Sequence, residues 1–336
     1  MPRHKVLEIV TEGVPEHRAV QAWLQVQPDS CAPRSLELLQ RRRHSTVYRL
    51  NKVRPDGTSV IAKRCRAATA RKERMIYQEL LPLTGMPALD CYGTVREPDA
   101  DFCWVFLEDA TGASYSPQLP GNRALAGRWL AETQLAAASA NFQSCLPDRG
   151  LNDYLQALHG CRAMALRHLD ANELPAADAE LLRKVATYMD GIESLWNEIG
   201  EICVVMPRLL IHGDFVIKNI RIRETAAGAA LLVFDWEFAG WGVPAADLAQ
   251  FTDRVATPDL NIYCSTLRRA HPHLNLRDIQ AVAACGNLLR MVDQIGWITA
   301  GSEFVPPQKL VKVISALGCY EASMIESLRV FRMELT

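Results

Sequence analysis

The sequence predicts an α+β protein of two lobes, with a small N-terminal antiparallel sheet and a larger, mainly helical C-terminal part. Short strand-like runs dominate up to about residue 109, whereas long stretches of helical periodicity dominate after residue 120. The 336 residues also exceed the size, roughly 250 to 300 residues, at which a single hydrophobic core stops growing. We therefore expect a first domain at 1–109 and a second at 110–336.

The first domain begins with a short helix at about 14–28, where Val20, Trp23 and Leu24 recur at helical spacing before Pro28. The strand-like runs that follow are separated by turn signals, of which Pro55-Asp56-Gly57 is the strongest. We expect strands at 35–41, 46–52, 58–63, 88–94 and 102–108, with a helix at 67–82 between the third and the fourth.

The second domain is expected to be helical apart from one hairpin. Helical periodicity covers 121–143, 175–199, 277–299 and 307–332. Between the second and third of these stretches, Ile220-Arg-Ile-Arg and Leu231-Leu-Val-Phe alternate like short strands and are joined by a Gly-containing turn.

Composition narrows the possible roles. The formal net charge is −1, which argues against a nucleic-acid partner, since such proteins usually carry a basic excess. Ten cysteines occur without a Cys-x-x-Cys pair, as is typical of free thiols in a reducing compartment. No apolar segment approaches the roughly 20 residues needed to cross a bilayer. We expect a cytoplasmic enzyme with no membrane partner, and its oligomeric state stays open.

The residues that suggest a chemistry follow apolar runs in the hairpin region. Asp214 comes after Leu209-Leu-Ile-His-Gly, where its carboxylate can orient a substrate hydroxyl. Asn219 and Asp235 offer the amide and carboxylate oxygens that magnesium prefers. A lone His-Gly-Asp is more often a turn that matches by chance, but the three residues in this order favour phosphoryl transfer.

The same stretch continues with Asp235-Trp-Glu237 and Gly242-Val-Pro-Ala-Ala-Asp247, and this pattern resembles the aminoglycoside phosphotransferase and choline kinase superfamily, relatives of the protein kinases. The resemblance spans about 35–255 and is strongest at 209–251. It implies a bilobal protein-kinase-like fold that uses ATP or GTP with Mg²⁺. It further implies that Asp214 is the catalytic base and that Asn219 and Asp235 are the metal ligands.

The resemblance also implies a phosphate-holding lysine that pairs with a helix glutamate in the small lobe. Lys63 ends the strand-like run Val60-Ile-Ala-Lys, and Glu73 lies on the following helix. Glu79 is a rival on the same helix, but Glu73 fits better because it precedes the apolar Met75-Ile76.

Two further stretches match nucleotide-binding positions of such proteins. Ser45 and Thr46 stand in the hairpin that would cover the nucleotide, where their hydroxyls could donate to phosphate; an exposed basic hairpin is an equally good interpretation. Glu108 and Ala110 follow the last strand of the small lobe, at the expected hinge whose backbone would bind the purine edge.

Four neighbours of the motif keep open roles. Lys218 either contacts the γ-phosphate or points outward, and we favour the second interpretation. Glu237 is a candidate to support the magnesium shell, and His212 is expected to be structural. Asp247 either ties down the catalytic segment or caps a helix that begins near Pro244.

The resulting hypothesis is a kinase that phosphorylates a hydroxyl of a small polar molecule, with an aminoglycoside or related antibiotic as the first candidate. The alternative is a metabolic kinase for choline, homoserine, a sugar or a natural-product intermediate, because the acceptor is set by the site rather than the fold. A nucleotide-binding pseudokinase would have lost the base, a metal ligand or the lysine, and all are present. Protein acceptors are disfavoured, since no Ala-Pro-Glu segment follows Asp235.

Overall fold

The computed structural model describes residues 6–42, 44–98, 101–171, 174–251, 254–302 and 307–334. The chain forms two compact units. Residues 1–115 and 218–238 make up the first, which we call the sheet unit, and residues 116–217 and 239–336 make up the second, the helical unit. The expected division into domains at residue 109 stays a prediction, since a compact unit need not fold by itself.

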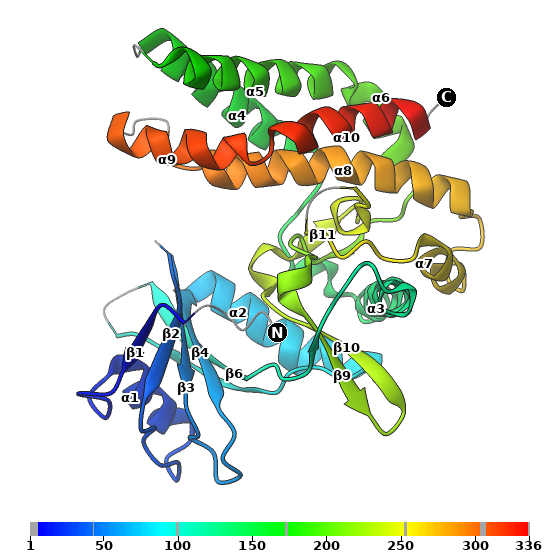
Figure 1. Cartoon of the computed structure of the whole chain (residues 1–336). Helices are drawn as coiled ribbons and strands as arrows, with labels where there is room; N and C mark the ends of the chain where they lie inside the picture. The colour runs from blue at the N-terminus through cyan, green and yellow to red at the C-terminus, as the bar shows by residue number, and fades with distance from the viewer. Residues whose placement is uncertain are drawn as a thin grey trace. The chain divides into compact units, whose positions relative to one another are not determined.

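The sheet unit is built on a six-stranded antiparallel sheet with the strand order β1-β2-β3-β4-β6-β5 (Figure 1). Its central strands pair without a break, so that Lys63 on β4 lies between Val47 on β3 and Val105 on β6. The strands are β1 (Glu8–Val10), β2 (Leu36–Arg41), β3 (Ser45–Leu50), β4 (Val60–Arg66), β5 (Cys91–Arg96) and β6 (Phe102–Glu108).

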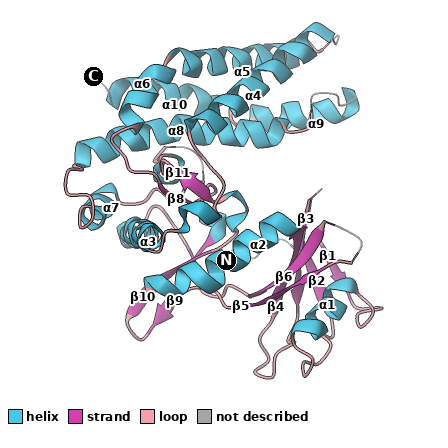
Figure 2. Cartoon of the chain, turned by 180° about the vertical axis from the view of Figure 1, so that it is seen from behind, coloured by secondary structure: helices cyan, strands magenta, loops and turns pink. Residues whose placement is uncertain are grey.

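The two faces of this sheet have different roles. Helix α1 (Arg18–Val26) covers one face, where its Trp23 shares a buried cluster with Ala62 and Phe106 (Figure 2). Because side chains alternate along a strand, Lys63 points to the opposite face from Ala62. The same alternation that directs Ala62 toward α1 therefore directs Lys63 toward the other face of the sheet.

The helix expected at 67–82 is present, but it changes its winding. Regular α-helix α2 (Ala67–Met75) passes into a π-helical turn at Ile76–Leu80 and a 3-10 turn at Leu81–Thr84. Pro82 accounts for the change, since its ring would clash with the carbonyl four residues earlier in a regular α-helix. The π turn shifts that carbonyl, and the helix ends two residues beyond the proline.

The predicted hairpin is present as β9 (Ile220–Thr225) and β10 (Gly228–Val233). The sequence places it in the helical domain, whereas its contacts group it with the sheet unit. The short strand β7 (Ala113–Ser114) pairs with β9 and explains the difference. Gly112 allows this approach, because a Cβ atom there would lie 2.3 Å from the carbonyl oxygen of Ile222.

The helical unit packs its long helices around α8, which is buried along most of its length (Figure 1). An Asn275–Asp278 capping box starts α8. A two-stranded pairing of β8 with β11 completes the unit. Its elements are α3 (Pro120–Ser139), α4 (Leu151–Ala171), α5 (Ala176–Ser194), α6 (Trp196–Cys203), β8 (Leu209–Ile211), β11 (Gly240–Gly242), α7 (Leu260–Leu267), α8 (Leu276–Thr299), α9 (Pro307–Gly318) and α10 (Glu321–Glu334).

The α+β class is confirmed, and each predicted helical stretch contains at least one helix. Helix α4 is not among the predicted stretches. Its buried positions Tyr154, Leu158, Cys161, Ala165 and His168 recur at helical spacing, so a signal for this helix was present in the sequence. Within the described ranges, no helix has both the length and the apolar character needed to span a membrane. A cytoplasmic location stays a prediction.

Candidate active site

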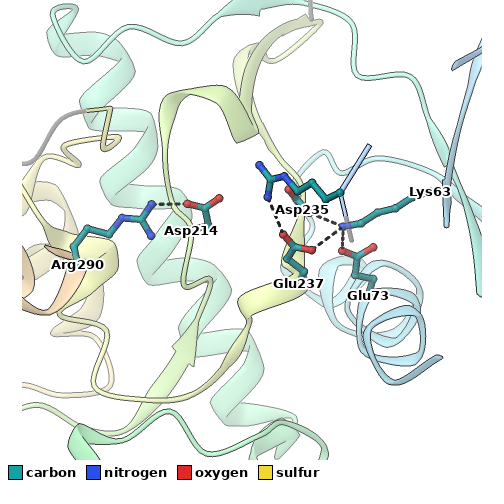
Figure 3. A network of polar contacts seen from close by, with 7 residues as sticks. Lys63, Glu73, Asp214, Asp235, Glu237 and Arg290 are labelled. Carbon is teal, nitrogen blue, oxygen red and sulfur yellow. Dashed lines mark hydrogen bonds and ion pairs between the residues drawn. The ribbon is translucent and has the colours of Figure 1, made fainter. Parts of the chain in front are cut away.

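In the sheet unit, Lys63 lies at the centre of a group of carboxylates (Figure 3). Its Nζ donates to Oε1 of Glu73 at 2.7 Å and to Oδ1 of Asp235 at 2.5 Å, and Oε2 of Glu237 lies 4.0 Å away. Glu79, the rival partner on the same helix, is exposed. The expected pairing of the lysine with Glu73 is therefore present, and Asp235 joins it.

Burial and neighbouring charges shift the pKa values of the side chains in this group. Burial alone would lower the pKa of Lys63, but the Asp235, Glu73 and Glu237 carboxylates raise it well above its usual value. Burial raises the pKa of Glu73 and of Glu237, and the nearby Asp235 raises both further. The lysine is therefore protonated, and Glu237 is also approached by the partly exposed Arg42, whose Nη1 lies 3.9 Å from its Oε1.

The backbone at Asp235 is unusual. Its φ of +69° lies in the left-handed region, which residues other than glycine seldom adopt, although aspartate tolerates it better than most. On α2, Nζ of Lys72 donates to the carbonyl oxygen of Glu237 at 2.7 Å. The turn that carries Asp235 is thereby fastened to the same helix that carries Glu73.

A pocket of about 450 Å³ opens beside this group, within the sheet unit. Such a volume lies within the range of roughly 300 to 1,000 Å³ that small-molecule sites occupy. Its apolar lining includes Val47, Ile61, Leu107 and Phe234. Its polar lining includes six of the predicted residues or their neighbours: Lys63, Glu73, Glu108, Lys218, Asn219 and Asp235, and Ala110 also lines it.

Ser45 and Thr46 lie at the start of β3, outside the set of residues that line this pocket. Ser45 is buried, and its hydroxyl has no hydrogen-bond partner among the described residues. Arg43, in the same predicted hairpin, lies outside the described residues. A phosphate contact by Ser45 or Thr46 stays a prediction.

The expected hinge holds two ion pairs that the sequence analysis does not include. Glu108 pairs with Arg223 on β9, and Asp109 accepts from Nε of Arg49 on β3 at 2.7 Å. Both carboxylates are therefore occupied by arginines. A purine contact by the backbone of Glu108 and Ala110 stays a prediction.

Asp214 lies in the helical unit, just after β8. His212 and Gly213 precede it, and their backbone N–H groups donate to Oδ2 and Oδ1 of Asp247 at 2.6 and 3.0 Å. Nδ1 of His212 accepts from the backbone N–H of Asp214 at 3.2 Å. Asp247 thus holds the backbone of the segment that precedes Asp214, and the His212 ring bonds within that segment. A catalytic role for this segment stays a prediction. Burial raises the pKa of Asp247 to about 6.

Arg290 on α8 is the partner of Asp214 that the sequence analysis missed (Figure 3). Its Nη2 donates to Oδ1 of Asp214 at 2.5 Å and its Nη1 to the carbonyl oxygen of Gly213 at 2.8 Å. Arg290 is 3% exposed and Asp214 is also 3% exposed. A sequence signal was available, because Arg290 and Asp293 interrupt the apolar run Leu288-Leu-Arg-Met-Val-Asp in a helix that is otherwise buried.

Asp293 forms a second ion pair on α8. Its Oδ2 accepts from Nη2 of Arg149 at 2.9 Å. Burial raises the pKa of Asp293 to about 6, although Arg149 and Arg290 act to lower it. The helical unit therefore holds two buried arginine–carboxylate pairs, Arg290 with Asp214 and Arg149 with Asp293.

The donor set in the sheet unit suits a magnesium ion. Asn219 is 3% exposed and lines the same pocket as Asp235, so an amide and a carboxylate oxygen are available there. Mg²⁺ usually takes one or two protein carboxylates and completes its shell with water and phosphate. Among the described residues, no group of three or more His, Cys, Asp or Glu side chains is arranged to hold a metal ion, and magnesium binding stays a prediction.

Comparison with known proteins gives a family and a fold. The model of the phosphotransferase enzyme family matches residues 35–281. No curated protein matches the chain in sequence. A solved spectinomycin phosphotransferase in complex with ADP and spectinomycin is similar in structure, with a TM-score of 0.60 at 10% identity, over 91% of this chain and 97% of that chain.

Two further solved structures share this fold. An aminoglycoside 2′-phosphotransferase in its GDP complex has a TM-score of 0.58 at 13% identity, over 90% of this chain and 97% of that chain. A choline kinase from Cryptosporidium parvum has a TM-score of 0.57 at 10% identity, over 88% of each chain. At such identities the likeness establishes the fold, and the kinase-like fold class predicted from the sequence is confirmed.

Proposed function

The chain belongs to the phosphotransferase enzyme family, and from this premise we propose that it transfers the γ-phosphoryl group of ATP or GTP to a hydroxyl of a small polar molecule. The observation that carries the proposal is the buried contact of Lys63 with Glu73 and Asp235 beside a pocket of about 450 Å³. A lysine held this way presents a fixed positive charge to phosphate oxygens.

The residues have the following proposed roles. Lys63 holds the nucleotide phosphates, and Glu73 holds Lys63. Asn219 and Asp235 hold Mg²⁺, which when bound neutralises charge on the transferred phosphoryl group. The backbone at Ala110 binds the purine edge, above the apolar lining of the pocket.

Asp214 is the proposed catalytic base. It accepts the proton of the acceptor hydroxyl as the hydroxyl oxygen forms a bond to the γ-phosphorus. The bond between that phosphorus and the β–γ bridging oxygen breaks, and the nucleoside diphosphate leaves with the bond's electron pair. The burial of Asp214 and its short contact with Arg290 support this role, because both restrict the positions that the carboxylate can adopt.

An aminoglycoside or a related antibiotic is the first proposed acceptor. The fold likeness to a spectinomycin phosphotransferase and to an aminoglycoside 2′-phosphotransferase supports this choice. The second candidate is a small metabolic alcohol such as choline, since the fold likeness to a choline kinase is nearly as high.

The test is nucleotide consumption by the purified chain with Mg²⁺, ATP or GTP, and a panel that contains spectinomycin, kanamycin, choline, ethanolamine and homoserine. We expect one acceptor class to stimulate turnover, and we expect Asp214→Ala to reduce that turnover by about 10² to 10⁴-fold. Undiminished turnover in Asp214→Ala would contradict the assignment of the base. Phosphorylation of choline alone would select the second candidate.

A further inference from the structure

Arg290 holds the segment that carries Asp214 by two different groups. Its guanidinium donates both to the carbonyl oxygen of Gly213 and to Oδ1 of Asp214. The planar fork of a guanidinium fixes the directions of two acceptors at once, which a lysine ammonium does not do. The backbone and the carboxylate of the proposed base are therefore held by one rigid group.

The same segment is also held by Asp247, which accepts from the N–H groups of His212 and Gly213. Gly213 has a φ of +79°, so the turn needs a residue that adopts the left-handed region between the contacts made by Asp247 and those made by Arg290. The position of Asp214 thus depends on two buried side chains that lie far along the sequence, Asp247 and Arg290.

The other charged groups near Asp214 are engaged elsewhere or act at a greater distance. Asp293, one turn along α8, is paired with Arg149. Asp247 binds backbone N–H groups, and the His212 ring accepts from the N–H of Asp214. The ring of Trp297, also on α8, faces the Arg290 guanidinium at 4.8 Å and supports it from another direction. Arg290 directly contacts the Asp214 carboxylate.

We propose that Arg290 is the positioning residue of the phosphoryl-transfer site. It fixes the rotamer of Asp214 by holding Oδ1, and so sets the direction in which the carboxylate faces the acceptor hydroxyl. It also favours the ionised carboxylate, which is the form that can act as a base. This inference rests on the proposed function, because Arg290 acts through Asp214.

The experiment compares three variants of the full chain with the wild type. Arg290→Gln removes the charge, Arg290→Lys keeps the charge but loses the fork, and Arg149→Gln is the matched control. The control breaks the other buried arginine–carboxylate pair on α8 without removing the contact to Asp214. Each protein is assayed from pH 5 to pH 9 with the acceptor that stimulates turnover or, if none does, by magnesium-dependent hydrolysis of the nucleotide in water.

We expect Arg290→Gln to lower kcat by about 10²-fold, with a smaller change in the KM for nucleotide, since a misplaced catalytic group costs about that much. The acidic limb of its pH–rate profile should move up by about one pH unit or more, because the carboxylate has lost its cation. Arg290→Lys should restore the position of the acidic limb but only part of kcat. Arg149→Gln should lower thermal stability and leave the acidic limb in place.

An Arg290→Gln enzyme with the wild-type acidic limb, or an Arg149→Gln enzyme with the same shift, would overturn the inference while leaving the proposed function intact. If Arg290→Gln fails to fold, Arg290→Lys decides: full kcat in that variant means that the fork has no positioning role. Full activity in Asp214→Ala, or no turnover by the wild type even with water as acceptor, would contradict the proposed function, and the inference would fall with it.

Discussion

The buried charges of the two units are balanced in opposite ways. In the sheet unit, one buried lysine contacts or approaches three carboxylates, those of Glu73, Asp235 and Glu237. In the helical unit, Asp214 pairs with Arg290 and Asp293 pairs with Arg149, while Asp247 accepts from backbone N–H groups. The first group has more carboxylates than buried cations, with the partly exposed Arg42 near Glu237, whereas in the second each ion-paired carboxylate has an arginine of its own.

The difference indicates what each group requires. Buried carboxylates that repel one another are stabilised by an added cation, so the sheet-unit group is suited to receive one. A carboxylate with an arginine of its own is already compensated, and the ion pair fixes its position. We therefore infer that the first region is suited to binding a cation and the second to positioning a side chain.

The largest expected loss of stability comes from substituting Lys63, the buried cation of the sheet-unit group. Lys63→Met leaves three carboxylates around an apolar side chain, and breaking a buried ion pair typically destabilises a protein by about 3 to 5 kcal/mol. We expect a clear loss in the free energy of unfolding, measured by urea denaturation at pH 7. We also expect Mg²⁺ to restore part of it, because the metal replaces the missing charge.

Glu73→Gln is the companion variant, since it reduces the negative surplus while keeping the shape of the side chain. It should be less destabilised than Lys63→Met and respond less to Mg²⁺. Equal losses in the two variants would mean that the surplus charge has no energetic consequence, and the comparison between the units would fail.

A second prediction concerns pH and the helical unit. Asp293 and Asp247 have pKa values of about 6 in the folded chain against a usual 3.8. Because these values are raised, the unfolded chain releases protons first, and stability is lost as pH rises from about 4 through 6. Each residue should account for about 3 kcal/mol of that loss.

Asp293→Asn removes one of the two titrating groups and can still accept from Arg149. Urea denaturation at several pH values between 4 and 7 should therefore give a flatter dependence than in the wild type. An unchanged slope would show that Asp293 ionises in the fold as easily as in the unfolded chain.

A third prediction tests how closely α8 packs against the backbone at Ala245. A Cβ atom on Gly286 would lie 1.9 Å from the carbonyl oxygen of Ala245, just before the turn that carries Asp247. We expect Gly286→Ala to destabilise the chain by about 1 to 3 kcal/mol. Activity should fall as well, since Gly286 lies about one turn before Arg290.

Gly160→Ala on α4 is the matched control, because a Cβ atom there would meet nothing within 4 Å. Alanine is the better helix former, so this variant should gain up to about 1 kcal/mol. Differential scanning calorimetry of both variants decides the matter. A stabilised Gly286→Ala would mean that α8 can move away from Ala245 without cost.

The sequence predicts those parts of the fold and site that depend on neighbours in the chain. Asp214, Asn219 and Asp235 are recognisable because they follow apolar runs at short spacing. Lys63 and Glu73 lie on a strand and on the helix that directly follows it. The alternation of Val60-Ile-Ala-Lys63 also determines the face of the sheet on which the lysine lies.

The contacts that are missed join residues distant in sequence. Arg290 and Arg149 are each more than 60 residues from the carboxylate that they contact, and spacing along one chain does not reveal such a pair. The sequence also fails to predict that the β9–β10 hairpin belongs to the sheet unit, because this depends on the pairing of β7 with β9, two strands that are distant in sequence. Hydrophobic periodicity finds a helix, but it does not find the partner of a polar residue buried within it.

The left-handed backbone at Asp235 has a consequence for engineering. Such a conformation costs a residue other than glycine about 1 to 3 kcal/mol, so Asp235→Gly would relieve backbone strain. The same exchange would remove the contact with Lys63 and delete the proposed metal ligand. A library of this chain selected for thermal stability should therefore be screened for turnover wherever residue 235 changes, because backbone relief and the proposed chemistry compete at that position.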